Sequence, residues 1–375
     1  MKIFNKYTYL LIGIITIIVV GLFIIIPNFQ TEEFDQEVIE DIAKGITTTS
    51  ITVKSEETVV EEEVSDSESF ENISVEEVSE IEEILKINIV DKKIDIFNAY
   101  LLIGSDERSE LIQETRGYVE GRRADVIIIG LVHKETNKMS LLSLPRDLLV
   151  INPCTKKMER INGSFNKNDC GGNAENLAAT ILNISGIKIN HFASFNFEGF
   201  EEIIDSIGGI EICLDDTQRE GYSFEIQKGC QKVMGLPALN WVVSRNTEIL
   251  VGEKIIDEEG NDISEWKKMP GVSDLTRVKR QQYIVTQLLK ELNNFDSINE
   301  LNKFVTAVEN TFIIDENITI NKAVEILWSF RNIDMDSIQK LTAPVSPYEL
   351  KDGRQVLVLK QNLYEFLIKE NIFNE

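Results

Sequence analysis

The sequence predicts an α/β fold, a layered α-β-α domain with a central mixed sheet, which follows one N-terminal transmembrane helix and an acidic stalk. Apolar segments of strand length alternate with helical segments, a pattern typical of layered α/β domains. Two of the strands are joined by the hairpin-like sequence HKETNK, which requires antiparallel neighbours within that sheet. Hydrophobic residues make up 43% of the chain, which excludes wholesale disorder.

The N-terminus predicts a membrane anchor. Residues 9–26 are 18 residues without a charge, enough to span roughly 27 Å as a helix. The run is longer than the core of a signal peptide and no A-x-A-like cleavage site follows it, so we expect an uncleaved anchor over residues 9–27. Lys2 and Lys6 lie in residues 1–8, which should therefore stay cytoplasmic. The expected location is the cell membrane, single-pass, with the folded domain that follows extracytoplasmic.

The acidic residues are concentrated directly after this anchor. Residues 31–85 hold 19 acidic and 2 basic residues, a local charge of −17, whereas the whole chain carries −25. Because Lys2 and Lys6 add two positive charges, residues 86–375 carry only −10. Such a charge run predicts an extended, self-repelling segment, and we expect residues 28–93 to form an acidic disordered stalk. The net negative charge and the exported topology argue against nucleic acid as a partner.

The folded part is predicted as a main domain, residues 94–292, with a C-terminal α/β extension, residues 293–375, packed on it. Strands are expected at residues 94–104, 124–132, 139–144, 191–197, 210–214 and 355–359. The first ends at a Gly-Ser-Asp turn, and the second and third form the hairpin. Helices are expected at residues 173–184, closed by Ser-Gly, at 198–207, ended by two glycines, and at 236–243, 274–292, 301–308 and 322–330. Asp274 is a good N-cap for the longest helix. No internal repeat is present.

Four cysteines lie in the folded part: Cys154, Cys170, Cys213 and Cys230. No C-x-x-C spacing occurs and the two histidines, His133 and His191, are not at zinc-finger spacing, which argues against a zinc site. An exported chain with an even number of cysteines favours disulfides. Of the three possible pairings, the local ones, Cys154–Cys170 and Cys213–Cys230, are favoured. Four buried thiols are the alternative.

Polar residues interrupt three apolar segments at strand ends, where open α/β sheets bind ligands. Asp106 follows the first strand, in GSDER. Arg123 and Asp125 stand at the mouth of the next strand, in GRRAD, and Arg146 and Asp147 follow the third, in SLPRD. Each residue taken singly is more often a turn residue or a solvated side chain.

The helix predicted at residues 274–292 carries a cation and an amide inside its apolar face. At about 100° per residue, Arg277 and Gln281 fall within the arc formed by Val278, Ile284, Val285, Leu288 and Leu289, whereas Lys279, Gln287 and Lys290 lie opposite. A buried charge is costly unless something pairs with it. A bound anion would supply that partner, and an internal ion pair with Asp274 is the structural alternative.

Arg245, in WVVSRNTE, adds a further arginine before this helix. Arginine holds phosphate oxygens bidentately. Several arginines with two aspartates suit magnesium-assisted phosphoryl transfer. No P-loop, kinase loop or G-x-S-x-G motif is present. His133 and His191 are interpreted as structural.

Six segments resemble, in chain order, the LytR-CpsA-Psr family of cell-wall glycopolymer ligases. They are LLIGSDER, GRRADVIIIGLVHKETNKMSLLSLPRD, RINGSF, INHFASFNFEGFEEIIDSIGGIEICL, GLPALNWVVSR and SDLTRVKRQQ. The resemblance covers roughly residues 97–292. The G-R-x-D…S-x-P-R-D block and the D-x-x-R-x-x-R-Q-Q block are specific in combination.

This resemblance implies a phosphotransferase that moves a glycopolymer from an undecaprenyl-pyrophosphate carrier in the membrane to peptidoglycan. It implies Mg²⁺, or Mn²⁺ in its place, at Asp106 and Asp125. The implied pyrophosphate-binding residues are Arg123, Arg146, Arg245, Arg277, Arg280 and Gln281, and the implied catalytic residues are Arg146, Arg277 and Asp106. The apolar side of the sheet and its helices would form a tunnel for the prenyl tail. No residue is identified as the general base.

Two departures from the family pattern leave other functions open. Val243 stands where the family usually has the first arginine of an R-x-R pair, and residues 246–273 form a longer, more acidic segment that could cover the site or reshape the acceptor groove. The alternatives are a non-catalytic polyprenyl-phosphate-binding carrier or sensor, and a polyprenyl-pyrophosphate hydrolase.

Overall fold

The computed structural model describes residues 30–45, 85, 89–105, 123–165, 173–271, 274–350 and 353–373. Within these residues no helix is both long and apolar enough to cross a membrane. The predicted anchor at 9–27, Asp106, Cys170 and residues 46–84 of the predicted stalk lie outside them.

A seven-stranded mixed sheet forms the centre of the molecule, with the strand order β1-β14-β7-β2-β3-β4-β15. Its strands are β1 (Gln30–Glu32), β2 (Phe97–Ser105), β3 (Ala124–His133), β4 (Met139–Ser143), β7 (His191–Phe195), β14 (Phe312–Asp315) and β15 (Gln339–Thr342). Three neighbouring pairs, β1–β14, β2–β7 and β4–β15, are parallel and the other three are antiparallel. The predicted mixed sheet and its hairpin between β3 and β4 are therefore confirmed.

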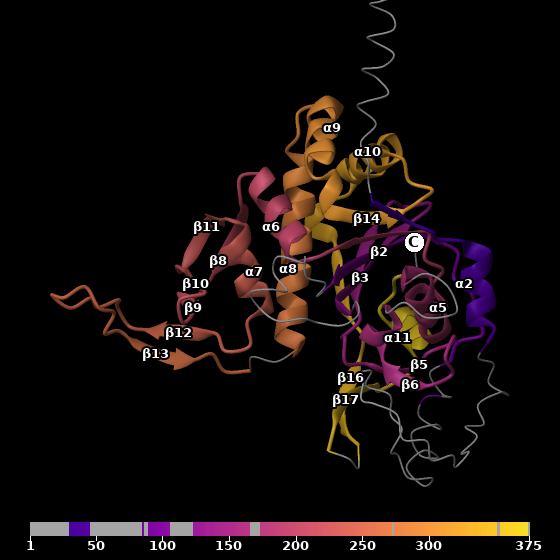
Figure 1. Ribbon diagram of the computed structural model, residues 1–375, viewed down its shortest axis with the longest axis horizontal. Coiled ribbons are helices and arrows are strands. Elements are labelled where there is room, and N and C mark those ends of the chain that lie inside the picture. The colour runs from indigo at the N-terminus through magenta and orange to yellow at the C-terminus, as the bar shows by residue number, and fades with distance from the viewer. Residues whose placement is uncertain are drawn as a thin grey trace, which may run out of the picture.

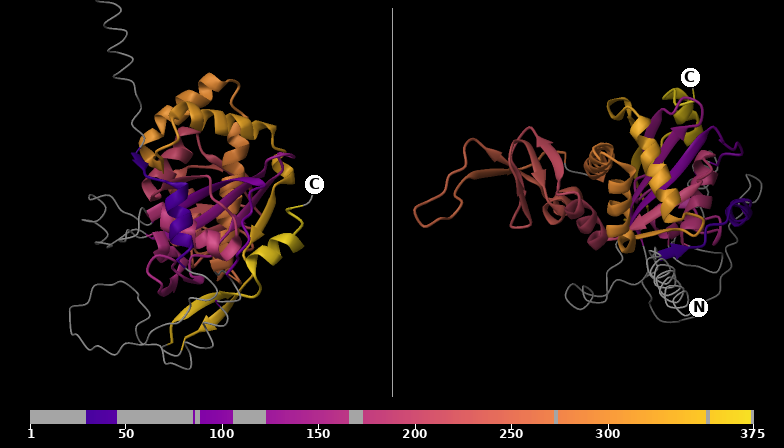
Figure 2. Two further views of the ribbon diagram at one scale, coloured as in Figure 1. Left: turned by 90° about the vertical axis from the view of Figure 1, so that its right-hand side faces the viewer. Right: turned by 90° about the horizontal axis from the view of Figure 1, so that it is seen from above.

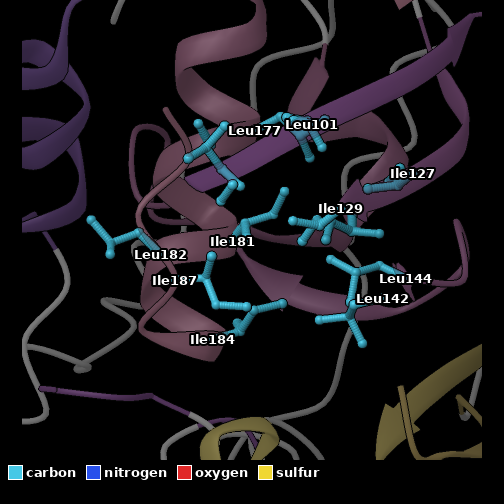
Figure 3. Close-up of a cluster of buried hydrophobic side chains, with 14 of the residues drawn as sticks. Leu101, Ile127, Ile129, Leu142, Leu144, Leu177, Ile181, Leu182, Ile184 and Ile187 are labelled. Atoms are coloured by element: carbon cyan, nitrogen blue, oxygen red, sulfur yellow. The ribbon is translucent and has the colours of Figure 1, made fainter. Parts of the chain in front are cut away.

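Helices cover both faces of this sheet (Figures 1 and 2). One face packs on α5 (Asn173–Ser185), with α2 (Gln36–Ala43) and α11 (Leu363–Lys369) beside it. Figure 3 shows Leu177 and Ile181 of α5 against Leu101 and Ile129 of the sheet. The other face packs on α8 (Asp274–Asn293) and α10 (Ile320–Ser329), through Ile128, Leu141, Leu289 and their neighbours. The layered α-β-α architecture is thus as predicted.

The start of the predicted stalk belongs to this core. β1 pairs with β14, and α2 contributes the buried side chains Ile39 and Ala43 to the same cluster as α5. Glu175 of α5, which is 2% exposed, accepts a hydrogen bond from the backbone N–H of Asp35 at 2.7 Å. The prediction of a disordered stalk is therefore wrong for residues 30–45. The acidic composition hid a short amphipathic helix whose apolar side faces α5.

The C-terminal residues complete the sheet instead of forming a separate extension. β14 and β15 are four-residue strands of the main sheet, so the predicted boundary at residue 293 does not separate two units. Strands this short have weak sequence signals, and pairing with distant partners decides their conformation. The remaining elements here are α9 (Ile298–Ala307), a hairpin of β16 (Val345–Glu349) and β17 (Gln355–Leu359), and the 3₁₀ turns at Glu309–Thr311, Phe330–Asn332 and Met335–Ser337.

A smaller lobe projects from the α8 side of the sheet. It contains α6 (Phe197–Ser206), α7 (Gly235–Val243), β8 (Ile210–Leu214) and β11 (Gly229–Val233), with a core that includes Ile212, Trp241 and Ile284. The predicted Cys213–Cys230 disulfide is present and joins directly paired residues of β8 and β11. Cys154 is also disulfide-bonded, and its predicted partner, Cys170, lies outside the described residues.

A β-sheet arm extends from this lobe and includes the unusual segment 246–273. β12 (Glu248–Val251) and β13 (Glu265–Lys268) join β9 (Gln218–Glu220) and β10 (Phe224–Ile226) in a four-stranded sheet. The arm points away from the body of the molecule (Figures 1 and 2). The segment therefore extends the lobe and does not fold over the ends of the central strands. The last small sheet pairs β5 (Leu149–Ile151) with β6 (Met158–Arg160), and a 3₁₀ helix follows at Ile161–Phe165.

Candidate functional site

Charged side chains gather where β3 begins, where β4 ends and where α8 begins. Arg123 directly precedes β3, Asp125 is its second residue, and Arg146 and Asp147 follow β4. The start of α8 is fixed against the same end of the sheet by a buried amide. The side-chain nitrogen of Gln282 donates to Ser143 Oγ at 2.9 Å and to the backbone oxygen of Leu341 at 2.6 Å.

Arg146 is the centre of a chain of alternating charges. Its Nη1 donates to Asp125 Oδ1 at 2.6 Å, and its Nε lies 3.7 Å from Asp147 Oδ2. The other oxygen of Asp147 lies 3.5 Å from Nε of Arg160 on β6. Arg146 and Asp125 are both about four-fifths buried. The two carboxylates therefore hold the Arg146 guanidinium in one orientation, close to the other charged side chains at this end of the sheet.

Arg277, in the first turns of α8, faces this chain of charges. Burial, followed by the nearby positive charges of Arg146 and Arg245, lowers the pKa of Arg277 to about 10, and Asp125 and Asp147 oppose the shift. Arg245 is exposed in the loop that follows α7. We call these five residues the arginine cluster. It carries three guanidinium groups against two carboxylates, and a bound anion would reduce the repulsion among the three.

Arg280 does not belong to the arginine cluster, contrary to the prediction that it binds pyrophosphate. Its side chain is buried and donates to the backbone oxygen of Trp241 at 2.7 Å, to Thr247 Oγ1 at 3.0 Å and to Gln218 Oε1 at 3.2 Å. The guanidinium also lies 4.9 Å from the centre of the Trp241 ring. Arg280 therefore joins α8 to α7 and to the base of the arm.

An apolar cavity of about 320 Å³ lies between the sheet and the covering helices. Its walls come from five strands and five helices and are almost entirely aliphatic and aromatic. Gln281 lines it, one turn along α8 from Arg277, as do the predicted apolar-face residues Ile284, Val285, Leu288 and Leu289. The predicted stripe on α8 thus faces a cavity. Val243, where the family has an arginine, also lines this cavity.

The oxygen ligands that the structure describes near the cluster suit a hard cation. Asp125 offers a carboxylate, and Mg²⁺ typically binds through one or two carboxylates together with substrate phosphates. The described residues contain no group of three or more His, Cys, Asp and Glu that could hold a metal by themselves. Asp106, the second predicted ligand, lies outside them. A metal here would need Asp125 and oxygen atoms of the substrate.

Arg160, which lies next to the arginine cluster, was not predicted as a site residue. It stands in RINGSF, one of the motifs that carried the family resemblance, and this position was the available signal for it. Asp147 was noted at a strand end with Arg146, but no role was predicted for it. Of the histidines, His133 accepts backbone N–H groups within its own hairpin, and His191 pairs with the buried Asp315 at 3.0 Å, so neither is in the arginine cluster.

Comparisons with known proteins identify the family of this chain. The family described as LytR_cpsA_psr family matches residues 46–252 and 264–371. A probable cell wall biosynthesis protein, LcpB of Corynebacterium glutamicum, is 32% identical over 157 residues, which cover 40% of this chain and 36% of that protein. The polyisoprenyl-teichoic acid–peptidoglycan teichoic acid transferase TagU of Enterococcus faecalis is 25% identical over 242 residues, 64% of this chain and 69% of that protein.

Solved structures share the fold. TagV of B. subtilis superposes with a TM-score of 0.56 at 20% identity and covers 75% of this chain and 96% of its own. The LytR-Csp2A-Psr enzyme from Actinomyces oris has a TM-score of 0.52 at 19% identity, covering 75% and 96%. The match to the family extends over most of the sequence and leaves out residues 253–263, at the tip of the arm. This chain belongs to the LytR-CpsA-Psr family.

Proposed function

We propose that this protein is a membrane-anchored transferase that moves a glycopolymer from a polyprenyl-pyrophosphate carrier to peptidoglycan. The supporting observation is the junction of the arginine cluster with the apolar cavity, one helical turn apart on α8. A ligand that fits both has a strongly anionic group attached to a long apolar chain. Relatives named as polyisoprenyl-teichoic acid–peptidoglycan teichoic acid transferases carry such a substrate in their names.

In this proposal the arginine cluster stabilises charge during phosphoryl transfer. A hydroxyl of the acceptor attacks the phosphorus next to the glycan and releases its proton to solvent. The bond from this phosphorus to the oxygen of the lipid phosphate breaks, and the lipid phosphate leaves with the electron pair. Arg146, Arg245 and Arg277 bind the non-bridging oxygens, on which negative charge is concentrated. Asp125 and Asp147 hold Arg146 in one orientation. When bound, Mg²⁺ would neutralise phosphate charge, with Asp125 and the predicted Asp106 as its protein ligands.

The proposed topology follows from the sequence. Residues 9–27 would anchor the protein with residues 1–8 in the cytoplasm, so that the arginine cluster works outside the cell membrane, where peptidoglycan is assembled.

A second candidate function is a carrier or sensor that holds a polyprenyl phosphate without transferring anything. Val243 supports it, because an aliphatic side chain replaces one expected phosphate contact and lines the apolar cavity instead. Such a protein would retain lipid and show no turnover, and its affinity would be the same with and without magnesium.

The test is a transfer assay with the full-length protein in vesicles. Incubation with magnesium, a short polyprenyl-pyrophosphate glycan and peptidoglycan oligomers should release polyprenyl phosphate and label the peptidoglycan. Lys279→Ala is a matched control, because Lys279 is exposed on the same helix, two residues from Arg277. Lipid binding without any release would favour the carrier. Release of polyprenyl phosphate in the absence of peptidoglycan would indicate a hydrolase.

A further inference from the structure

The α9–α10 pair forms one end of the apolar cavity. α9 follows α8 directly and is joined to α10 through β14. The two helices share a small cluster of buried side chains, Leu301, Val305 and Val324. Five of their apolar residues line the cavity, namely Phe304, Val305, Ala323, Ile326 and Leu327. The two helices therefore pack mainly on each other, and the inner side of the pair lines the cavity.

The arginine cluster lies at the opposite end of this cavity. Both Gln281 and Leu292 line the cavity, and Leu292 also packs on the α9–α10 cluster. The rise of an α-helix separates these two residues by about 16 Å along α8. Figure 1 shows α9 and α10 beside the end of α8 that is far from its first turn. A chain whose phosphates are held near Arg277 would thus extend toward α9 and α10.

β1, the first described strand, lies next to the strand that joins α9 to α10. It begins at Gln30 and pairs in parallel with Ile313–Asp315 of β14. The predicted anchor ends at residue 27 in the sequence, and three residues span at most about 10 Å. If residues 9–27 anchor the protein, as proposed above, β14 would lie close to the point where the chain leaves the bilayer. The acidic residues 46–84 would then follow this point in the sequence and would not separate it from the sheet.

We propose that the α9–α10 pair is the bilayer-facing wall of the cavity, through which the apolar tail of the lipid donor passes from the membrane. This rests on the proposed function, because it takes the anchor and the lipid donor from there. Passage directly from bilayer to cavity avoids exposing the apolar chain to water. The same orientation directs the arginine cluster away from the membrane, toward an acceptor in the cell wall.

The first test measures which surface contacts lipid and needs no turnover. All cysteines in the described parts of the chain are disulfide-bonded, so an introduced thiol can be labelled selectively without reductant. A fluorophore at Ile298→Cys on α9 or Asn321→Cys on α10 should be quenched severalfold by nitroxide lipids in vesicles that hold the full-length protein. A fluorophore at Ile256→Cys, on the tip of the arm and 52% exposed, should not. Equal quenching at all three positions, or stronger quenching at Ile256→Cys, would overturn the proposal.

The second test narrows this end of the cavity. Ala323→Trp places a large ring on the inner side of α10, whereas Ala307→Trp places it on the exposed side of α9 as a matched control. Uptake of a fluorescent long-chain polyprenyl phosphate from vesicles should fall at least tenfold relative to a two-isoprene analogue in Ala323→Trp, and the ratio should not change in Ala307→Trp. An unchanged ratio in a folded Ala323→Trp would contradict the proposal. If quenching and uptake behave as expected but no glycan is transferred, only the proposed enzyme activity would be ruled out. The proposal for the α9–α10 pair would stand.

Discussion

Arg277 and Arg280 lie about one turn apart on α8, and the two arginines differ in the charge of the groups that surround them. Burial is the main cause that lowers the pKa of each to about 10. Arg280 is surrounded by neutral acceptors, a backbone carbonyl, an amide and a hydroxyl, and by an aromatic ring. Arg277 is close to two further guanidinium groups. Burial therefore does not distinguish the two arginines. The neighbouring guanidinium groups do, and they are the reason that we propose Arg277, and not Arg280, as a phosphate-binding residue.

The largest expected effect is on activity. Arg277→Ala should lower transfer by about a hundred- to a thousandfold, because it removes a group that stabilises charge in the transition state. The ligand-free protein should remain folded, since burial and the neighbouring charges of Arg146 and Arg245 both oppose the positive charge of Arg277 and lower its pKa. Transfer assays and urea unfolding measure the two effects.

The control for this variant is Lys279→Ala, which changes an exposed cation on the same helix. Unfolding of Arg277→Ala in the absence of ligand would contradict the comparison, because it would make Arg277 a structural residue. It would then have an internal partner such as Asp274.

Arg280→Ala should show the reverse pattern. It removes three hydrogen bonds from a buried charged donor, although Gln218 Oε1 keeps the hydrogen bond from Trp241 Nε1 and Thr247 Oγ1 keeps the one with Ser244. We expect a loss of about 3 kcal/mol in the free energy of unfolding. Urea unfolding measures this loss. In conditions where the variant is folded, its affinity for inorganic pyrophosphate should match that of the unaltered protein. A weakened affinity with unchanged stability would place Arg280 in the arginine cluster after all.

A smaller effect should appear when an anion binds. Inorganic pyrophosphate at about 100 times its Kd should add about 2.7 kcal/mol to the free energy of unfolding. Thermal unfolding measures the gain. Arg277→Ala should lose most of it and Arg280→Ala should retain it. An equal gain in both variants would show that the anion binds elsewhere.

The sequence predicts the arginine cluster better than it predicts the packing around it. Arg146, Arg245, Arg277 and Asp125 are brought together as expected because each follows or precedes an element with a clear apolar pattern. Arg280 was misassigned because α8 packs on two sides. The sequence shows the apolar stripe toward the cavity. It does not show that α7 and the base of the arm cover Arg280 on one flank of this stripe, or that Gln282 is buried on the other flank against Ser143 and Leu341.

The fold, too, was predicted correctly in one part and missed in another. Long strands and capped helices were located within a few residues, and the mixed sheet followed from one hairpin. The two edges of the sheet were missed, because β1 lies in an acidic segment and β14 and β15 have four residues each. Their conformation depends on partners that are distant in sequence, which neither composition nor periodicity reveals.

The smallest expected effect concerns magnesium. Asp125→Asn should raise the magnesium concentration for half-maximal transfer by at least about tenfold, because it replaces a charged ligand with a neutral amide. The loss in the free energy of unfolding should be about 1 to 2 kcal/mol, since the amide oxygen can still accept the hydrogen bond from Arg146 but carries no charge. Asp147→Asn separates the two roles of these carboxylates. It also loosens Arg146, but Asp147 is not a predicted ligand, so activity should fall without a change in the magnesium midpoint. The same midpoint in Asp125→Asn and in the unaltered protein would remove Asp125 from the metal site, and its function would then be to orient Arg146.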